Sequence, residues 1–429
     1  MTISTDSQHF PDGNVITPYE AEAFVQSLKS FSLDQVASPQ WMKQRSYIDK
    51  LNLQAHQSAQ ALNDEFVVDL LLSFDKVKVL ISELLVLDTW ISTVFSSQID
   101  SHSQLKNSPK TYFVLFHLGS LTNLLECVFY NKDALASSSD LLLDFVDFCT
   151  RMARCLTSVD PYLVCQSGES EEVKEKLKLI LYSTAISCLH ILRFITEAKE
   201  DLPLSLPHYF YTSVDLPCLA IELLEQRPWV LLNREKKVRM TWNGSQFQND
   251  SEPNVIHKVE ATLFLILFSL FSSQSVSQKY EITSSRRDTL IKVTSLIKTP
   301  YYDQLPILND LRGILDQLQF IKPDSSHQSL FMVAEEPDFC YNLSRNTELV
   351  SVAKSNLDSF FGPDSMKELV DIADVYSSPS VSEVLERPKC AECGVVAKFR
   401  CSRCKIDWYC DRDCQKRSWP RHKYFCKKQ

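Results

Sequence analysis

Apolar residues recur at intervals of three and four along most of the chain between positions 17 and 380. The spacing is sustained over several turns in four stretches, at 67–84, 114–128, 177–195 and 308–318. It places apolar side chains on one face of a helix with 3.6 residues per turn. Prolines and serines punctuate the pattern where helices are expected to begin and end. The pattern predicts an all-α fold for this part of the chain.

Many helices with short connections are typical of a stack of the armadillo or HEAT kind. Because no sharp repeat of about 40 to 47 residues is visible, an irregular helical domain is the alternative. We expect a flexible tail at residues 1–16, a helical interaction body at 17–380, a linker at 381–389 and a small finger at 390–426.

One stretch breaks the helical pattern. Residues 239–248 read RMTWNGSQFQ, and the pair Asn243-Gly244 is a strong signal for a tight hairpin turn. The stretch is therefore either a small hairpin or a long loop between helices, and of the two we favour the loop.

Glycine is scarce enough to exclude several classes of enzyme. The chain has 429 residues and seven glycines, and the two nearest in sequence are Gly362 and Gly394. A GxGxxG turn, a phosphate-binding GxxxxGK[ST] loop and a GxSxG elbow each need two glycines a few residues apart. The usual nucleotide-binding enzymes, protein kinases and α/β-hydrolases are thereby excluded.

The N-terminus, the apolar runs and the cysteines lead us to expect a protein that is neither secreted nor inserted in a membrane. The polar, acidic N-terminus does not have the pattern of a signal peptide. The apolar run from Ala261 to Phe271 is too short to span a bilayer, so we expect no transmembrane segment.

Seven of the 14 cysteines lie in the body without ligand spacing, and we expect them to be buried free thiols in a reducing compartment. His190 is interpreted as a packed histidine rather than a ligand.

The C-terminal segment carries eight candidate metal ligands in the spacing C-x2-C-x7-C-x2-C-x5-C-x3-C-x7-H-x3-C. A C-x2-C pair can point two thiolates at one ion, and pairs four residues apart face the same way on a helix. The eight residues are Cys390, Cys393, Cys401, Cys404, Cys410, Cys414, His422 and Cys426.

Loop length indicates which pairs share an ion. Neighbouring pairs are separated by a cramped loop, whereas skipping a pair gives the separation of about 15–20 residues that is usual in zinc modules. We therefore expect two structural Zn²⁺ in an interleaved arrangement, since every ligand is a protein group. The first ion takes Cys390, Cys393, Cys410 and Cys414, and the second takes Cys401, Cys404, His422 and Cys426.

The finger is basic and the rest of the chain is acidic. Residues 387–429 hold 13 Lys and Arg against 4 Asp and Glu, a formal charge of +9, while the chain as a whole carries −9. The remainder therefore carries −18 and would repel nucleic acid. Metal-bound thiolates reduce the charge of the finger further. We expect no nucleic-acid partner and a finger surface suited to an acidic one.

The ligand spacing, with Gln415 after Cys414 and Trp419 before His422, is similar to that of the MYND family. Fingers of that family bind short proline-containing segments of partners. The resemblance implies a partner-binding face at Gln415 and Trp419, with Trp408 and Tyr409 nearby. Pro420 is expected to interrupt the helix that carries them.

The body also resembles a family of MYND proteins, through EAEAFVQSLKSF (20–31), KLNLQA (50–55), NLLECVFYNKD (123–133), LPCLAIELLEQRPW (216–229), DQLP (303–306) and ERPKC (386–390). That resemblance implies a cytoplasmic factor, found also at centriolar satellites or dynein assembly particles, for preassembly of inner and outer axonemal dynein arms of motile cilia. The implied partners are other assembly factors, chaperones and co-chaperones, with dynein chains as clients.

Two other functions occur among MYND proteins. A SET-type lysine methyltransferase carries its finger inside the catalytic domain with an Asn-His pair, and this chain has no such pair; we therefore expect no enzyme. A transcriptional corepressor adaptor is the alternative function, and it predicts nuclear enrichment.

Overall fold

The structure is a computed structural model, and it describes residues 15–62, 64–98, 109–167, 173–198, 203, 205–233, 238–250, 254–272, 280–318, 335–345, 352, 390–393, 399–401, 407–423 and 426. The chain divides into two compact units. One is the body, residues 18–362, and the other joins residues 1–17 to residues 363–429, which include the finger. The expected tail at 1–16 lies mostly outside the described residues, and the expected linker at 381–389 lies wholly outside them.

The body is built from helices of very unequal length. The α-helices are α1 (Pro18–Ser27), α2 (Pro39–Ala61), α3 (Phe66–Ser73), α4 (Val77–Thr89), α5 (Ser96–Gln98), α7 (Pro109–Phe129), α8 (Asp133–Ser137), α9 (Leu142–Cys155), α10 (Pro161–Ser167), α11 (Val173–Glu197), α12 (Ser205–His208), α13 (Leu216–Gln226), α14 (Lys258–Phe271), α16 (Ser284–Leu296), α17 (Thr299–Gln304), α18 (Leu308–Leu318) and α19 (Phe339–Arg345). Short 3₁₀ turns are η1 (Leu33–Gln35), η3 (Ser139–Leu141) and η4 (Leu156–Ser158), and π-helical turns are η2 (Trp90–Phe95) and η6 (Tyr209–Ser213). The predicted all-α class is confirmed, and the unequal lengths favour the irregular alternative over regular repeats.

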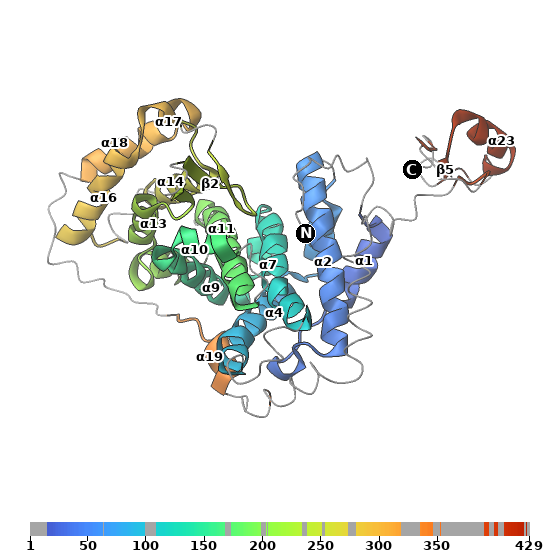
Figure 1. The fold of residues 1–429 in the computed structure, drawn as a ribbon, viewed down its shortest axis with the longest axis horizontal. Coiled ribbons are helices and arrows are strands. Elements are labelled where there is room, and N and C mark those ends of the chain that lie inside the picture. Colours follow the sequence, from blue (N-terminus) through green and yellow to red (C-terminus); the bar gives the residue numbers. More distant parts are fainter. Residues whose placement is uncertain are drawn as a thin grey trace. The chain divides into compact units, whose positions relative to one another are not determined.

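Three long helices form the centre of the body. Helix α7 packs against α2 on one side and against α11 on the other (Figure 1). The apolar positions predicted from the spacing lie inside: Leu118, Leu121 and Leu125 of α7 are fully buried, as are Ile191 and Ile195 of α11. Burial of a leucine or isoleucine side chain contributes about 1.5–3 kcal/mol, so these helices supply much of the core.

The apolar run at 67–84 forms two helices rather than one. Helix α3 ends at Ser73 and α4 begins at Val77, with Asp75 in the left-handed region at φ 51°. The Lys76 N–H donates to the Leu71 carbonyl at 2.9 Å, which is a helix-terminating bond. Apolar spacing continues across the turn because both helices face the same core, and the spacing alone therefore hides the break.

Polar side chains are buried between α2, α4 and α7. His117 and Glu83 are both almost completely buried, and His117 Nε2 lies 2.8 Å from Glu83 Oε1. Arg45 and Asp49, one turn apart on α2, form an ion pair of 3.0 Å in the same interior. Buried polar groups need partners, so these pairs restrict how the three helices can be aligned.

Residues 239–248 form a hairpin, so the favoured interpretation as a loop is wrong. Strands β1 (Val230–Asn233), β2 (Val238–Trp242) and β3 (Phe247–Asn249) make an antiparallel sheet in that order. Gly244 takes φ 109° in the turn, a conformation that glycine adopts without strain. Trp242 and Phe247 face one another and pack on Tyr182 of α11, with the Trp242 and Tyr182 rings 4.9 Å apart. This packing stabilises a hairpin that is too short to be stable alone.

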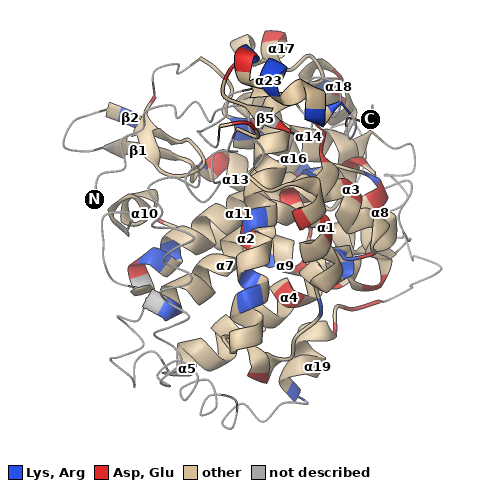
Figure 2. Ribbon diagram, turned by 90° about the vertical axis from the view of Figure 1, so that its right-hand side faces the viewer, with Lys and Arg blue, Asp and Glu red and all other residues tan. Residues whose placement is uncertain are grey.

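Two of the described helices are long and apolar enough to cross a membrane by length and composition. They are Lys110–Phe129 and Glu175–Glu197, and 61% and 72% of their most apolar stretches are buried in the body. Figure 2 colours the charged positions on the ribbon; α7 carries few of them, and those of α11 lie towards its two ends. Central helices of a packed core have the same properties, and the absence of a transmembrane segment remains a prediction.

We predict that Leu118→Ala destabilises the body by about 2–5 kcal/mol, because it leaves a cavity at the α7 packing centre. The matched control is Leu163→Ala on α10, where the leucine is 50% exposed and the expected change is below about 0.5 kcal/mol. Guanidinium denaturation followed by circular dichroism measures both. Equal effects of the two substitutions would contradict the assigned core.

Candidate metal centre

The finger is built from a small hairpin followed by a helix. Strands β4 (Phe399–Arg400) and β5 (Trp408–Tyr409) pair antiparallel, and helix α23 (Arg412–His422) follows directly. Asp411 begins the helix, since its Oδ1 accepts a hydrogen bond from the Cys414 N–H at 2.7 Å. This bond also holds the pKa of Asp411 below its usual range. The cap fixes the first turn of α23, on which Cys414 lies.

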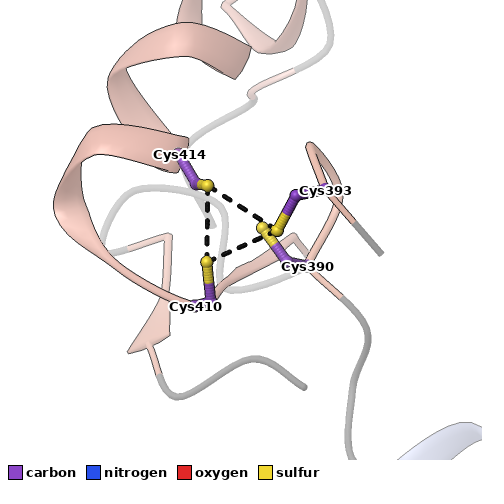
Figure 3. Close-up of side chains that lie close together, drawn as sticks. All are labelled: Cys390, Cys393, Cys410 and Cys414. Atoms are coloured by element: carbon purple, nitrogen blue, oxygen red, sulfur yellow. Dashed lines mark hydrogen bonds between the residues drawn. The ribbon is translucent and has the colours of Figure 1, made fainter. Parts of the chain in front are cut away.

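Four cysteines from three separate segments converge on one point (Figure 3). The Sγ atoms of Cys390, Cys393, Cys410 and Cys414 all lie within 4.8 Å of one another. The Sγ distances are 3.5 Å for Cys393–Cys410, 3.3 Å for Cys410–Cys414 and 3.7 Å for Cys414–Cys393. A zinc ion bonded to four thiolates at about 2.3 Å would separate them by about 3.8 Å. The cluster therefore has nearly the dimensions of a tetrahedral zinc site.

The protonation of these thiols also fits a bound dication. Burial would raise the pKa of Cys390, but backbone N–H groups of Cys393, Cys410 and Glu392 donate to its sulfur and bring the pKa down to about 6. Shared hydrogen bonds with Cys414 and Cys393 raise the pKa of Cys410 well above its usual range. Four sulfurs this close cannot all ionise unless a cation compensates their charge. A structural zinc ion bound by these four sulfurs would supply that charge.

A second cluster joins the residue that follows β4, the last residue of α23 and a residue beyond α23. Cys401, His422 and Cys426 are buried and offer ligand atoms within 4.8 Å of one another. The Cys401 and Cys426 sulfurs are 3.8 Å apart, and His422 Nε2 lies 3.2 Å from the Cys401 sulfur. Cys404, the fourth expected ligand, lies outside the described residues. The three described residues belong to the set that the interleaved arrangement assigns to one ion.

The sequence interpretation missed Asp407, which orients the histidine ligand. Asp407 Oδ2 lies 2.5 Å from His422 Nδ1, and its backbone carbonyl accepts from the Cys401 N–H at 2.8 Å. A carboxylate that accepts from one ring nitrogen fixes the tautomer and leaves Nε2 to bind metal. Its sequence signal was an acidic residue in the loop between two ligand pairs. That signal is too common to identify the residue without the fold.

Arginine side chains support the first cluster from α23. Arg417 Nη2 donates to the Cys414 sulfur at 2.9 Å, and Arg421 Nη2 lies 2.8 Å from Glu392 Oε2. A donor to a metal-bound thiolate offsets part of its negative charge. The two arginines lie four residues apart, and both serve the finger itself.

The expected partner-binding residues occupy different environments. Trp419 is 38% exposed, and Gln415 on the preceding turn is half-buried. Tyr409 is completely buried, with its hydroxyl 3.4 Å from Ser418 Oγ, so its expected place near a binding surface is wrong. It packs with the ligand cysteines as the interior of the finger. The side chain of Trp408 lies outside the described residues.

Helix α23 continues through Pro420, so the expected interruption is wrong. The missing N–H of Pro420 removes one hydrogen bond near the end of the helix, where fewer turns remain to be disturbed. The Lys423 N–H still donates to the Trp419 carbonyl at 3.0 Å, and the Cys426 N–H to the His422 carbonyl at 2.9 Å. The helix therefore places His422, its last residue, in the second cluster.

The body offers no comparable cluster among its described residues. His190 packs as expected, with Nδ1 2.8 Å from Glu126 Oε1. The expectation of buried thiols holds for Cys149 and Cys188 and is wrong for Cys155, which is exposed. Burial raises the pKa of Cys127 to about 12, so this thiol is not ionised at neutral pH.

Comparisons with known proteins agree with the geometry. Residues 390–426 match the family model described as the MYND finger. The Zinc finger MYND domain-containing protein 10 homolog of Drosophila melanogaster is 24% identical over 454 residues, covering 97% of this chain and 99% of that protein. Tudor domain-containing protein 1 of Homo sapiens is 33% identical over 66 residues, covering 14% of this chain and 6% of that protein. No solved structure matches.

We predict that Asp407→Asn weakens zinc binding at the second cluster about 10- to 100-fold, because the amide holds the His422 ring less firmly than the carboxylate. Competition with a chromophoric chelator measures the affinity. Asp413→Asn is the matched control, since Asp413 on α23 is 81% exposed. Equal zinc affinity of the two variants would show that Asp407 does not support the metal site.

Proposed function

We propose that this chain, which carries a MYND finger at residues 390–426, is a protein-interaction adaptor for the cytoplasmic preassembly of inner and outer axonemal dynein arms. The observation that supports the proposal is the alignment with the fly relative, which runs along 97% of this chain and 99% of that protein. A likeness of this extent includes the body as well as the finger. It supports a shared role more strongly than a match restricted to the finger would.

The proposed activity is binding without catalysis. The first cluster offers four protein ligands. Four ligands complete the tetrahedral coordination of one zinc ion and leave no coordination position for a substrate. We place a second zinc ion at Cys401, Cys404, His422 and Cys426, which makes two per chain. Both ions would hold the finger rigid, and a rigid platform loses little entropy when it binds a partner.

The body and the finger would then contact different proteins. The partners we propose are other dynein-arm assembly factors, chaperones and co-chaperones, with dynein chains as clients. The body would supply helical surface, and the finger would supply the Gln415 and Trp419 face. We place the protein in the cytoplasm, concentrated at centriolar satellites or dynein assembly particles. Nuclear enrichment of the tagged protein would favour a corepressor adaptor instead.

We predict that Trp419→Ala leaves zinc content unchanged and weakens partner capture by about 2 kcal/mol or more, as expected of an exposed aromatic hot spot. Zinc content and co-precipitation of assembly factors are measured on the same preparation. Tyr341→Ala is the control, because Tyr341 is a 65% exposed aromatic residue of α19 in the body. An unchanged zinc content together with undiminished partner capture would show that Trp419 is not part of a binding face. Loss of zinc would show that Trp419 stabilises the fold of the finger instead.

We also predict that ciliated cells lacking the protein assemble axonemes without inner and outer dynein arms. Electron microscopy of axoneme cross-sections shows the arms directly. Re-expression of the native chain should restore the arms, and re-expression of Trp419→Ala should not. Normal arms in cells without the protein would overturn the proposed function.

A further inference from the structure

Helix α19 lies on the body without burying any of its own side chains. It packs against α4 (Figure 1), and its seven residues are half-buried or exposed. The half-buried positions lie together on one side of the helix and are Phe339, Cys340, Leu343 and Ser344. A helix of this length is not stable alone in water, so its helical form depends on the surface beneath it.

Two residues of the body hold the start of α19, namely Thr89 of α4 and Asp144 of α9, and we call them the α19-binding surface. The first N–H of the helix, that of Phe339, donates to Asp144 Oδ1 at 2.9 Å. The Cys340 thiol lies within hydrogen-bond reach of the Thr89 side chain. A helix leaves its first N–H groups unpaired, and a carboxylate that accepts from one of them acts as an N-cap. Because this cap comes from another helix, the surface recognises the start of a helix.

The α19-binding surface lies in acidic surroundings. Asp88 on α4 and Asp147 on α9 are neighbours of Thr89 and Asp144 along their helices. The Arg151 guanidinium pairs with both of these carboxylates, with N–O distances of 3.0 Å to Asp88 and 2.8 Å to Asp147. Asp144 adds a third carboxylate against this one cation. The surface therefore favours an occupant without negative charge at its start.

The chain nevertheless brings more negative charge to this place, directly before α19. Glu335, Glu336 and Asp338 all lie within four residues of the first residue of the helix. Burial raises the pKa of Asp144, the Phe339 N–H opposes the rise, and the Asp338 carboxylate adds to it. The repulsion between the two carboxylates also weakens the docking of α19 at neutral pH.

We infer that the α19-binding surface receives a short helix of a partner protein, which begins with an aromatic residue and is preceded by neutral or basic residues. Helix α19 shows which backbone and side chains the surface accepts, and the acidic surroundings select against the charge that precedes α19. A segment of the same chain has an effective concentration on the order of millimolar, so a partner's helix replaces α19 only by binding more tightly. This inference rests on the proposed adaptor function and adds a binding surface of the body to it.

The reactivity of Cys340 in the zinc-loaded full chain measures whether α19 is docked. Iodoacetamide modifies this thiol faster when α19 leaves α4, and mass spectrometry of the digested protein separates Cys340 from the other cysteines. Asp144→Ala removes the cap and should speed the modification about fivefold. Asp140→Ala, at an exposed carboxylate just before α9, is the control and should not change it. Asp338→Asn removes the repulsion and should slow the modification about twofold.

Two synthetic peptides test the partner's chemistry. Both have the sequence of residues 335–345 with Cys340→Ala, and the second also carries Glu335→Lys, Glu336→Lys and Asp338→Asn. At equal concentrations the second peptide should speed the modification of Cys340 in the native chain about tenfold, and the unmodified acidic sequence should change it less than about twofold. Fluorescence anisotropy should show that Asp144→Ala weakens binding of the second peptide about tenfold and that Asp140→Ala leaves it unchanged.

Four outcomes would overturn the inference. They are equal Cys340 reactivity in Asp144→Ala and Asp140→Ala, failure of the second peptide to bind, equal binding of the two peptides, and peptide binding that does not depend on Asp144. A dimer in analytical ultracentrifugation that Asp144→Ala dissociates would make α19 of a second copy the occupant and would also overturn it. The dynein-arm experiment tests the adaptor function separately, because it does not depend on the peptides.

Discussion

Coordination of a cation by clustered thiolates is the interaction on which the C-terminal finger depends. Among the residues that the structure describes there, the apolar interior is made by the ligand cysteines Cys390, Cys401, Cys414 and Cys426 together with Tyr409. So small an apolar core cannot offset the entropy of ordering a segment of fewer than 40 residues. Structural zinc contributes on the order of 10–16 kcal/mol in comparable modules, which is enough to make folding conditional on metal. The position of Trp419, and with it the proposed partner surface, follows from that metal.

The ligand spacing carried most of the information about this centre. C-x2-C knuckles and pairs four residues apart are local geometries, so the sequence could predict which residues would face one ion. Asp407 could not be found in this way, because its role depends on the ring nitrogen of His422, a residue 15 positions later. Pro420 gave the opposite kind of error, because the sequence predicted an interruption that the helix does not have. A local rule predicted a break, and the nearby end of the helix made the loss of one hydrogen bond tolerable.

The body shows the same division between local and distant causes. Helices α7, α11 and α18 were predictable because their apolar spacing is local and continuous. The break at Asp75 was not, since two helices facing one core keep the spacing of a single helix. The sequence favoured a loop over the hairpin that follows Trp242, because the hairpin is stabilised by Tyr182, which lies 60 residues away on α11. Tertiary packing decides such short strands, and their own propensities do not.

The zinc content of two double variants tests the interleaved coordination most directly. Cys393→Ser with Cys410→Ser removes two ligands from one proposed site, whereas Cys393→Ser with Cys401→Ser removes one ligand from each. Elemental analysis of the purified full-length chains gives the metal content. The account predicts that the first variant keeps one zinc ion and that the second binds both weakly or not at all. Retention of one firmly bound ion by the second variant, with none in the first, would show that neighbouring pairs share each zinc and would contradict the account.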